Sequence, residues 1–385
     1  MRTMTVLIFF GIFFLVIGLI SFYIFIRGLQ SIPPDSSLRH PYKIIFWIVA
    51  GSFLGGRLLE RFLPSVLSDL FIWMGSFWIG AMIYFLVAIV SLDVLRLINH
   101  FMPFFPSAIT HNYSQAKYII SASVVGLVGV LLLGGHINSL MPRVKKLEIS
   151  MAKQSGGIKT LDIVAVTDIH LGTIVGRSRL DHIVDKINGL NPDLVLLPGD
   201  IVDEDLGPVI KQNLGEALRS IKARLGVYGS TGNHEHIGNV EQACTYLTNH
   251  NIVMLRDQSV KIGNSFYLVG REDRAIGRFD GHLRKALPEL MAYVDKRYPI
   301  ILMDHQPFGL NEAAVEGVDL QLSGHTHYGQ LWPINYIVRS IYELPWGYKK
   351  IADTHFYVSN GVGTWGPPVR LGHRPEIVFI HISFQ

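Results

Sequence analysis

The hydrophobic pattern of the chain changes near residue 140. Before that point, apolar residues form long runs with few interruptions. Four of these runs approach or exceed the roughly 20 apolar residues that a helix needs to cross a bilayer. They cover residues 4–26, 42–58, 70–97 and 118–141. The pattern therefore predicts a transmembrane region of about four helices within residues 1–141.

The first two runs need separate interpretation. The first follows Arg2 at the position of a signal peptide, but it is too long for the apolar core of such a peptide and no small-residue cleavage site follows, so we expect a retained helix. The second contains Gly51, Gly55, Gly56 and Arg57, and it is interpreted either as a span or as a re-entrant or interfacial segment. Gly51 and Gly55 would permit close helix contact, or the helix simply tolerates them.

Charged residues in this region indicate an anchor rather than a transporter. Asp93 and Arg96 fit an interfacial i,i+3 salt bridge better than an ion pathway. The basic residues on the side of the two termini would be Arg2, Arg57, Arg61, Arg143, Lys145 and Lys146, and those on the other side Arg27, Arg39, Lys43, Arg96 and Lys117. The positive-inside rule leans by one residue toward cytoplasmic termini and a cytoplasmic catalytic domain. We expect an integral, multi-pass membrane protein.

After Pro142 the chain changes to short apolar runs that each end in polar residues. After an alternating stretch at Leu147–Ala152, these runs are Leu161–Asp168, Asp193–Asp200, Leu225–Glu235, Tyr298–Pro307 and Val318–His327. Between the first two, apolar residues recur with the 3.6-residue spacing of a helix that packs on a sheet, at Leu180, Ile183, Val184, Ile187 and Leu190. This alternation predicts a mainly parallel or mixed sheet covered on both faces. We assign residues 142–160 to a linker and first strand, and residues 161–385 to the catalytic domain.

Composition and charge narrow the possibilities. The chain has 385 residues, of which 49% are hydrophobic and 17% charged, and most of the apolar excess precedes residue 140. Its net charge is only +4 and it contains no run of five like charges, so no nucleic-acid partner is expected. The single cysteine, Cys244, excludes an internal disulfide framework and a cysteine-based zinc site.

Metal-binding residue types collect at the strand ends. In open α/β sheets, ligands bind at the carboxyl edge of the strands. The groups there are Asp168-Ile-His170, Gly199-Asp200, Gly232-Asn233-His234-Glu235, Asp304-His305 and Gly324-His325-Thr326-His327. Residues i and i+2 of an extended chain point the same way, so Asp168 and His170 are expected to chelate one ion, and His325 and His327 to face the same cluster.

The ligand types indicate the kind of metal centre. Carboxylate, imidazole and one amide oxygen, with no thiolate, suit Mn²⁺, Fe²⁺ or Zn²⁺. Seven such groups exceed the coordination positions of one ion. We therefore expect two divalent ions that share one carboxylate, about 3.5–4 Å apart as in phosphatases.

These motifs resemble those of a known family. D-x-H, G-D, G-N-H-[DE], a later His and G-H-x-H, in this order, are similar to the signature of the calcineurin-like metallophosphoesterases, and the resemblance covers the chain from about Leu161 to its end. It implies a four-layer α/β/β/α sandwich. It also implies that Asp168, His170, Asp200 and His327 hold the first metal, and that Asp200 as the bridge, Asn233, His305 and His325 hold the second.

The resemblance further implies a reaction. The two metals would generate a bridging hydroxide that attacks the phosphoester, and His234, which does not ligate metal, would donate a proton to the leaving oxygen. Protein phosphatases of the superfamily carry G-D-x-x-D-R-G, whereas Gly199–Leu206 reads GDIVDEDL, so only Asp203 matches. The region Asn360–Ile377 is instead similar to small bacterial and animal members that are membrane-anchored or exported.

Several residues outside these roles have two interpretations. Arg370 either contacts a substrate phosphate or forms a structural salt bridge, and His236 either orients the catalytic residue or faces solvent. Asp304 either supports the ligand beside it or closes a strand-end turn. The histidines outside every motif, which we expect not to be ligands, are His111, His182, His282 and His373.

The function expected is that of a membrane-bound, dinuclear metal-dependent phosphoesterase. The alternatives are a pyrophosphohydrolase of a lipid-linked or nucleotide-sugar lipid substrate, and a catalytically silent membrane sensor of phosphorylated ligands. Leu331–Ala352 mixes Trp and Tyr with apolar and basic residues, as bilayer interfaces do. It either forms a wall toward the membrane for a lipid substrate or packs on the sheet as an ordinary loop; otherwise the substrate is a small phosphorylated molecule.

Overall fold

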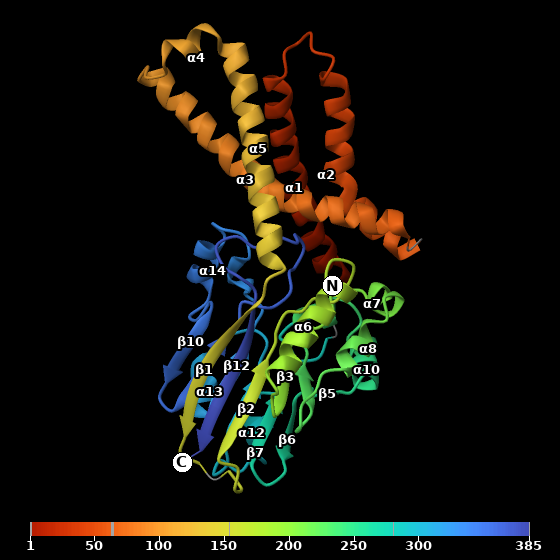
Figure 1. The fold of residues 1–385 in the computed structure, drawn as a ribbon, viewed down its shortest axis with the longest axis vertical. Coiled ribbons are helices and arrows are strands. Elements are labelled where there is room, and N and C mark those ends of the chain that lie inside the picture. The colour runs from red at the N-terminus through yellow and green to blue at the C-terminus, as the bar shows by residue number, and fades with distance from the viewer. Residues whose placement is uncertain (1, 63–64, 154, 280, 385) are drawn as a thin grey trace. The chain divides into compact units, whose positions relative to one another are not determined.

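The computed structural model describes residues 2–62, 65–153, 155–279 and 281–384, and the chain divides into two compact units (Figure 1). The first consists of residues 1–137 with Gly366–Val369. The second consists of residues 138–365 and 370–385. The first unit is helical and the second is an α/β domain.

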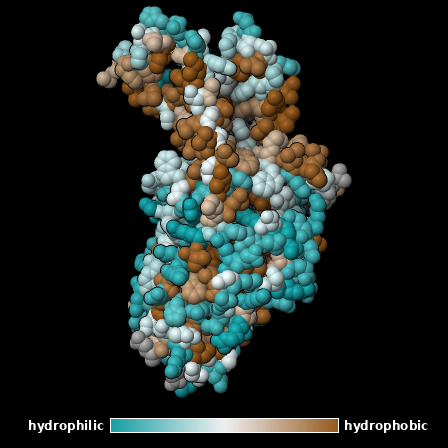
Figure 2. Space-filling view, viewed as in Figure 1, coloured by the Kyte–Doolittle hydropathy of each residue, from teal (hydrophilic) through white to brown (hydrophobic). Residues whose placement is uncertain are grey.

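The helical unit consists of long apolar helices. Its elements are α1 (Arg2–Ser31), α2 (Arg39–Phe62), α3 (Val66–Phe101), α4 (Ser107–His111) and α5 (Tyr113–Ser139). Among the described residues, four windows are long and apolar enough to cross a membrane: Phe14–Ser31, Arg39–Glu60, Val66–Phe101 and Tyr113–Ser139. Apolar side chains cover much of the surface of these helices, as Figure 2 shows in brown. Each window overlaps one predicted run, and the second run forms one continuous helix despite its glycines.

The glycines that allow close helix contact differ from the predicted pair. A Cβ at Gly51 would meet no atom within 4 Å, and one at Gly55 would only touch the Phe71 ring at 3.7 Å. At Gly75, by contrast, a Cβ would clash with the backbone of Phe53, and at Gly56 it would lie 2.7 Å from the amide nitrogen of Ile72. Helices α2 and α3 therefore approach each other through Gly56 and Gly75, because only a residue without a side chain fits there.

The charged pair of the third run makes a wider contact than predicted. Asp93 accepts from Arg96 at 3.2 Å, as the i,i+3 spacing indicated. It also pairs with Arg27 of α1 at 2.5 Å and accepts from the Tyr23 hydroxyl at 2.5 Å. The interaction therefore joins α1 to α3 rather than stabilising one helix alone.

The α/β unit contains two six-stranded sheets. The first has the order β1-β12-β2-β3-β4-β5, with strands β1 (Arg143–Met151), β12 (Glu376–Phe384), β2 (Thr160–Ala165), β3 (Leu194–Pro198), β4 (Val227–Ser230) and β5 (Ile252–Met254). The strands from β2 to β5 are parallel, and β12 is antiparallel to β2. The carboxyl ends of β2, β3 and β4 therefore lie at one edge.

The second sheet also has six strands, but its antiparallel pairs lie at its two edges. Its order is β10-β11-β9-β8-β7-β6, with strands β10 (Gly347–Ile351), β11 (Thr354–Val358), β9 (Leu320–Ser323), β8 (Ile300–Met303), β7 (Phe266–Gly270) and β6 (Gln258–Ile262). The central strands β11, β9, β8 and β7 are parallel, and both edge strands are antiparallel. The carboxyl ends of β8 and β9 share one edge.

Helices cover the outer faces of both sheets (Figure 1). On the first sheet these are α6 (Arg177–Gly189), α7 (Gly207–Lys211), α8 (Leu214–Arg219) and α10 (Val240–Asn249), and on the second α12 (Leu287–Met291) and α13 (Leu310–Val315). The other short helices, α9 (Asn233–Ile237), α11 (Ile276–Phe279), η1 (His327–Gly329) and α14 (Asn335–Ile341), add no described residue to these apolar cores. One apolar core joins α6 and α8 to the first sheet, a second lies between the sheets, and a third joins α12 and α13 to the second sheet. This is the predicted α/β/β/α sandwich, and its four layers follow from burying both faces of two sheets.

The strands are shorter than the apolar runs and more numerous. Each of the five runs contains a strand, but β2 ends at Ala165, before Asp168, so the metal-binding residue types stand in the turns that follow. β1 begins at Arg143, soon after the end of α5, and occupies residues 143–151 of the segment 142–160 that we assigned to a linker and first strand. It pairs with β12 from the other end of the chain, a long-range contact that the local pattern does not contain.

Candidate metal centre

The seven predicted ligands all follow the carboxyl ends of strands, five in the connecting loops and two, Asn233 and His327, as the first residues of α9 and η1. Those from the first sheet follow β2, β3 and β4, and those from the second follow β8 and β9. The two edges converge because the sheets pack face to face through the shared core. Residues that are more than 150 positions apart, such as His170 and His327, are thereby brought into contact.

The backbone at these turns is left-handed rather than extended. The φ angle is 54° at Asp168, 52° at His170, 50° at Asp200, 68° at His325 and 44° at His327. The expectation that Asp168 and His170 face one point because the chain is extended is therefore wrong. Each turns its side chain inward through a conformation that non-glycine residues rarely adopt and that costs about 1–3 kcal/mol.

Two glycines allow the turns to approach each other closely. A Cβ at Gly324 would lie 2.8 Å from the Thr167 Cβ and would clash with the carboxylate of Asp168. One at Gly232 would clash with the carboxylate of Asp200. Glycine is therefore required at both positions by space.

The first cluster consists of Asp168, His170 and His327. The Nε2 atoms of the two imidazoles lie 3.0 Å apart, and Nε2 of His327 lies 3.4 Å from Asp168 Oδ1. All three residues are buried, and one donor atom of each falls within 4.8 Å of the others. His325 is not part of this group, so the two histidines of GHTH serve different clusters.

The second cluster consists of Asp200, His305 and His325. Nε2 of His305 lies 3.1 Å from Asp200 Oδ2, and Nδ1 of His325 lies 2.7 Å from the Asn233 amide oxygen. Asp200 Oδ2 also lies 3.7 Å from Nε2 of His170 in the first cluster. Its carboxylate therefore stands between the two clusters.

The chemistry of these side chains fits divalent cations. Asp168 Oδ2 is buried and has no hydrogen-bond partner among the described residues, and such an oxygen is costly without a cation or donor. Burial, with a contribution from the charge of His305, lowers the pKa of His325 to about 3, and burial likewise lowers the pKa of His327. Both rings are thus held neutral, which is the form that ligates metal. Against the effect of burial, His305 and His234 lower the pKa of Asp200, which keeps its carboxylate charged.

His234 borders the first cluster and forms a pair with Asp203. Its ring meets the His170 ring edge-on at 4.5 Å, and its Nδ1 lies 2.9 Å from Asp203 Oδ1. Burial lowers the pKa of His234, but the charge of Asp200 and the bond to Asp203 outweigh it and raise the pKa to about 9. The ring therefore carries a proton at neutral pH. Asp203 was noted from the sequence as a partial motif match, but its partner is visible only in the fold.

Glu235 connects the GNHE turn to the GD turn. Its carboxylate is buried and accepts from the backbone amides of Ile201 at 2.7 Å, Val202 at 2.9 Å and Gly232 at 2.8 Å. The Asp200 amide donates to it as well, at 3.1 Å. Glu235 thereby fixes the distance between the turns that carry Asp200 and His234, a role that was not predicted.

Of the residues with two interpretations, Arg370 has the clearest outcome. It is fully buried, donates to the Gly363 carbonyl at 2.8 Å, and lies 3.3 Å from Nδ1 of His327. In this position it supports a cluster residue from behind. Asp304 is buried between Arg271 at 3.1 Å and Arg284 at 2.8 Å, in agreement with a supporting role beside His305.

The interpretation of His236 as a solvent-facing residue is wrong. Its side chain is buried rather than solvent-facing, and its Nε2 lies 3.1 Å from Glu272 Oε2. His373 stands outside the clusters but touches one of their members, since its Nε2 lies 2.9 Å from the His327 carbonyl oxygen. His236 and Glu272 belong to a buried polar network beside the site, which the sequence did not reveal.

The aromatic segment Leu331–Ala352 leaves the site directly. One part of it packs as an ordinary loop, and another part exposes apolar side chains. Trp346 packs on Tyr328 at 5.0 Å and donates to Glu376 at 2.9 Å, as an ordinary loop residue does. The large hydrophobic side chains of the segment with more than half of their surface exposed are Trp332, Tyr336, Ile337 and Ile341. Three of these four lie on α14, so this helix presents an apolar surface.

Comparison with known proteins agrees with these features. Residues 161–329 match the family model described as calcineurin-like phosphoesterase. The chain is 32% identical to an uncharacterized metallophosphoesterase of Aquifex aeolicus over 66% of this chain and 97% of that protein. It is 33% identical to a zebrafish (Danio rerio) transmembrane protein with metallophosphoesterase domain, over 66% of this chain. The match spans only 60% of the zebrafish protein's own length.

One further relative matches along the whole chain. An uncharacterized metallophosphoesterase of Campylobacter jejuni is 28% identical over 99% of both chains. Its match therefore includes the apolar helices as well as the α/β unit.

Proposed function

Because the chain belongs to the calcineurin-like metallophosphoesterases, we propose that it is a membrane-bound phosphoric ester hydrolase with a dinuclear metal centre. Asp168, His170 and His327 would hold one ion, His305, His325 and Asn233 the other, and Asp200 would bridge them. This assignment is supported by the two clusters and by the position of the Asp200 carboxylate between them. Mn²⁺, Fe²⁺ and Zn²⁺ all suit such a ligand set.

In this proposal the chain's own residues position the substrate and move a proton. Two bound ions would supply Lewis-acid stabilisation of the phosphoryl charge and a water of lowered pKa. His234 would donate a proton to the oxygen that leaves phosphorus, since it is protonated and lies beside the first cluster. Asp203 would hold the His234 ring through its Nδ1.

One observation carries the proposal more than any other. The donor atoms of six His and Asp side chains from two sheets fall into two compact groups, and one carboxylate stands between them. A phosphate-binding sensor without catalysis would not require a protonated His234 paired with Asp203 beside the cluster. The silent-sensor alternative is therefore disfavoured.

Hydrolysis by the full-length protein tests the proposal. The purified protein in detergent should hydrolyse an aryl phosphodiester or monoester, lose the activity with a chelator, and regain it when Mn²⁺ or Zn²⁺ is added. A folded, metal-loaded preparation that is inert toward phosphate monoesters, diesters and pyrophosphates would contradict the proposal. It would leave the silent sensor as the better account.

A lipid-linked substrate, such as a lipid pyrophosphate, is the second candidate. It is supported by the exposed apolar residues of α14 and by the bonds that attach this segment to the GHTH turn. Thr326 Oγ1 donates to the Pro345 carbonyl at 2.6 Å, and Arg339 donates to the Tyr328 hydroxyl at 2.6 Å. The apolar helices would keep the catalytic domain at the membrane, on the cytoplasmic side by the distribution of basic residues.

A further inference from the structure

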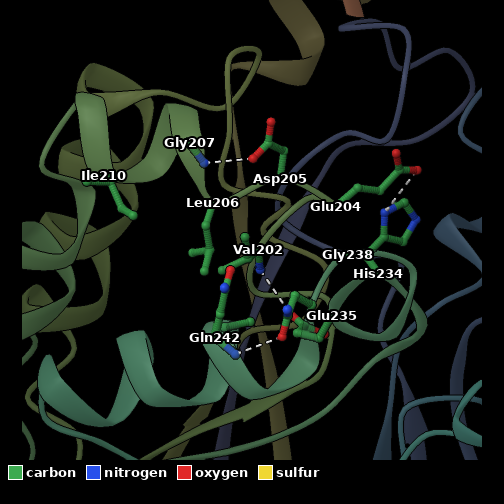
Figure 3. A pocket seen from close by; sticks show the side chains of 12 residues that line it. Val202, Glu204, Asp205, Leu206, Gly207, Ile210, His234, Glu235, Gly238 and Gln242 are labelled. Atoms are coloured by element: carbon green, nitrogen blue, oxygen red, sulfur yellow. Dashed lines mark hydrogen bonds and ion pairs between the residues drawn. The ribbon is translucent and has the colours of Figure 1, made fainter. Parts of the chain in front are cut away.

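A cavity of about 320 Å³ lies beside His234, away from the residues that would hold metal. Figure 3 shows it between α7, which carries Ile210, and the turn that carries His234. The loop Glu204–Gly207 forms one side, and the start of α10, with Gln242 and Ala243, forms the other. The volume is at the lower end of the range for ligand sites, so the cavity suits a small group.

His234 connects this cavity to the metal clusters. Its ring meets His170 of the first cluster at 4.5 Å, and the same residue lines the cavity. A proton donor must lie within hydrogen-bond distance of the oxygen that it protonates. If His234 protonates the leaving oxygen, the group attached to that oxygen must extend from His234, which lines this cavity together with Glu204, the residue toward whose carboxylate the His234 ring is turned (Figure 3).

The lining indicates which groups are accepted. Apolar contact comes from Leu206, Ile210 and Ala243, and Gln242 and Asp205 supply polar groups. Asp205 Oδ1 accepts from the Gly207 amide at 2.8 Å, and its side chain is exposed. No lysine or arginine is among the described residues that line the cavity. The one lining histidine, His234, already lies 2.9 Å from Asp203 Oδ1 and 3.9 Å from Glu204 Oε1. A second phosphate or a carboxylate would therefore meet the carboxylates of Glu204 and Asp205 without a further cation, whereas hydroxyl or ammonium donors would find acceptors.

We propose that this cavity, the alcohol pocket, binds the leaving group of the substrate and selects a small alcohol that carries hydroxyl or ammonium donors over one that carries another anion. The inference rests on the proposed phosphoesterase function and adds a substrate class to it. Water adds its oxygen to phosphorus, and the bond from phosphorus to the leaving oxygen breaks with its electron pair on that oxygen. His234 protonates the oxygen and recovers a proton from the water, so phosphate and a neutral alcohol are released.

Three phosphate esters test this selectivity in the full-length protein in detergent. sn-Glycerol 3-phosphate and 3-phosphoglycerate differ mainly by a carboxylate in the leaving group, and phosphoethanolamine carries an ammonium there. Each is measured as a substrate and as a competitor of aryl phosphodiester hydrolysis, so that weak turnover of monoesters still gives a result. We expect kcat/KM, or competitive affinity, to be about tenfold or more lower for 3-phosphoglycerate than for the other two. The order of those two shows whether hydroxyl or ammonium donors are preferred.

Variants separate the alcohol pocket from a general charge effect. Asp205→Asn should reduce the discrimination against 3-phosphoglycerate. Gln242→Trp, at an exposed position, should fill the pocket and lower kcat/KM or competitive affinity for glycerol 3-phosphate, while metal content stays unchanged. Glu216→Gln is the control, because it removes the same charge from a residue of α8 that does not line the pocket.

The outcomes distinguish failure of the alcohol pocket from failure of the phosphoesterase proposal. The alcohol pocket would be overturned if kcat/KM were equal for the three esters, or if Asp205→Asn and Glu216→Gln altered the discrimination to the same extent. In either case, hydrolysis of the aryl ester would still uphold the phosphoesterase proposal. Absence of hydrolysis of every ester, the aryl ester included, would overturn both.

Discussion

Five side chains of the candidate metal centre stand on left-handed backbone, and this strain is a property of single residues that no sequence pattern displays. D-x-H and G-H-x-H pointed to residues that the fold brings close together, but for the wrong local reason, since the chain at Asp168 and His170 is not extended. The motif order carried the information, because it pointed to the family to which the chain belongs. Asp203 and Glu235 lacked such a signal, since their roles depend on partners on other turns.

Asp203 provides a residue-level prediction about positioning. Asp203→Asn should lower kcat by roughly 10–100-fold, the usual effect of removing a group that orients a functional side chain. Because Asp203 holds His234 through Nδ1, KM and metal content should change little. Steady-state kinetics with metal analysis check this. If the variant loses metal, Asp203 acts as a ligand through the group that it forms with His170 and His234.

At the scale of elements, the strands with continuous apolar runs were predictable and the edge strands were not. β2, β3, β4, β8 and β9 are buried on both sides, so each stands out as an apolar run. β6 and β10 contain only exposed and half-buried positions, and β5 has only three residues. β12 does alternate clearly, but its pairing with both β1 and β2 joins distant parts of the chain. Local patterns carry no information about such pairing.

The buried network around Glu272 joins α9 to the loop after β7 and gives a pH-dependent prediction. Burial raises the pKa of Glu272, but hydrogen bonds from His236 and Thr231, with Arg256, outweigh it and lower the pKa below the usual glutamate value of 4.5. A carboxylate with a lowered folded-state pKa stabilises the fold above pH 4.5, and this contribution is lost as pH falls through the folded-state pKa.

Glu272→Gln should therefore lower stability at pH 7 by about 1–3 kcal/mol, since its partners lose a charged acceptor. The difference in Tm from wild type should shrink as the pH falls below about 4.5. Thermal unfolding across this range checks the prediction. A difference in Tm that stays constant from pH 7 to pH 4 would contradict the assigned cause.

The apolar surface of α14 gives a prediction about substrate form. Ile337→Ser with Ile341→Ser should lower kcat/KM for a lipid phosphoester or lipid pyrophosphate in mixed micelles and leave a water-soluble analogue with the same head group unchanged. Leu283→Ser is the control, because Leu283 is 90% exposed and lies outside this segment. Equal loss on both substrates, or no preference of wild type for the lipid form, would remove the lipid candidate and leave the phosphoesterase proposal intact.

For the whole molecule, the chain combines an apolar helical unit with an α/β unit that contains all the candidate catalytic groups. The division near residue 140 was visible in hydropathy alone, and the helices extend the predicted runs in several places. The proposal for the intact protein depends on whether the two side-chain clusters hold two ions and whether Asp200 joins them.

Metal content per chain, measured by inductively coupled plasma mass spectrometry on full-length protein reconstituted with Mn²⁺ or Zn²⁺, tests this most directly. Wild type should bind close to two ions. His234→Ala should keep both while turnover falls about 10²–10⁴-fold, the weight of general acid catalysis, whereas Asp200→Ala should lose metal and activity together. A folded wild-type protein that binds no more than one ion, or a His234→Ala variant stripped of metal, would contradict the dinuclear centre and the role given to His234.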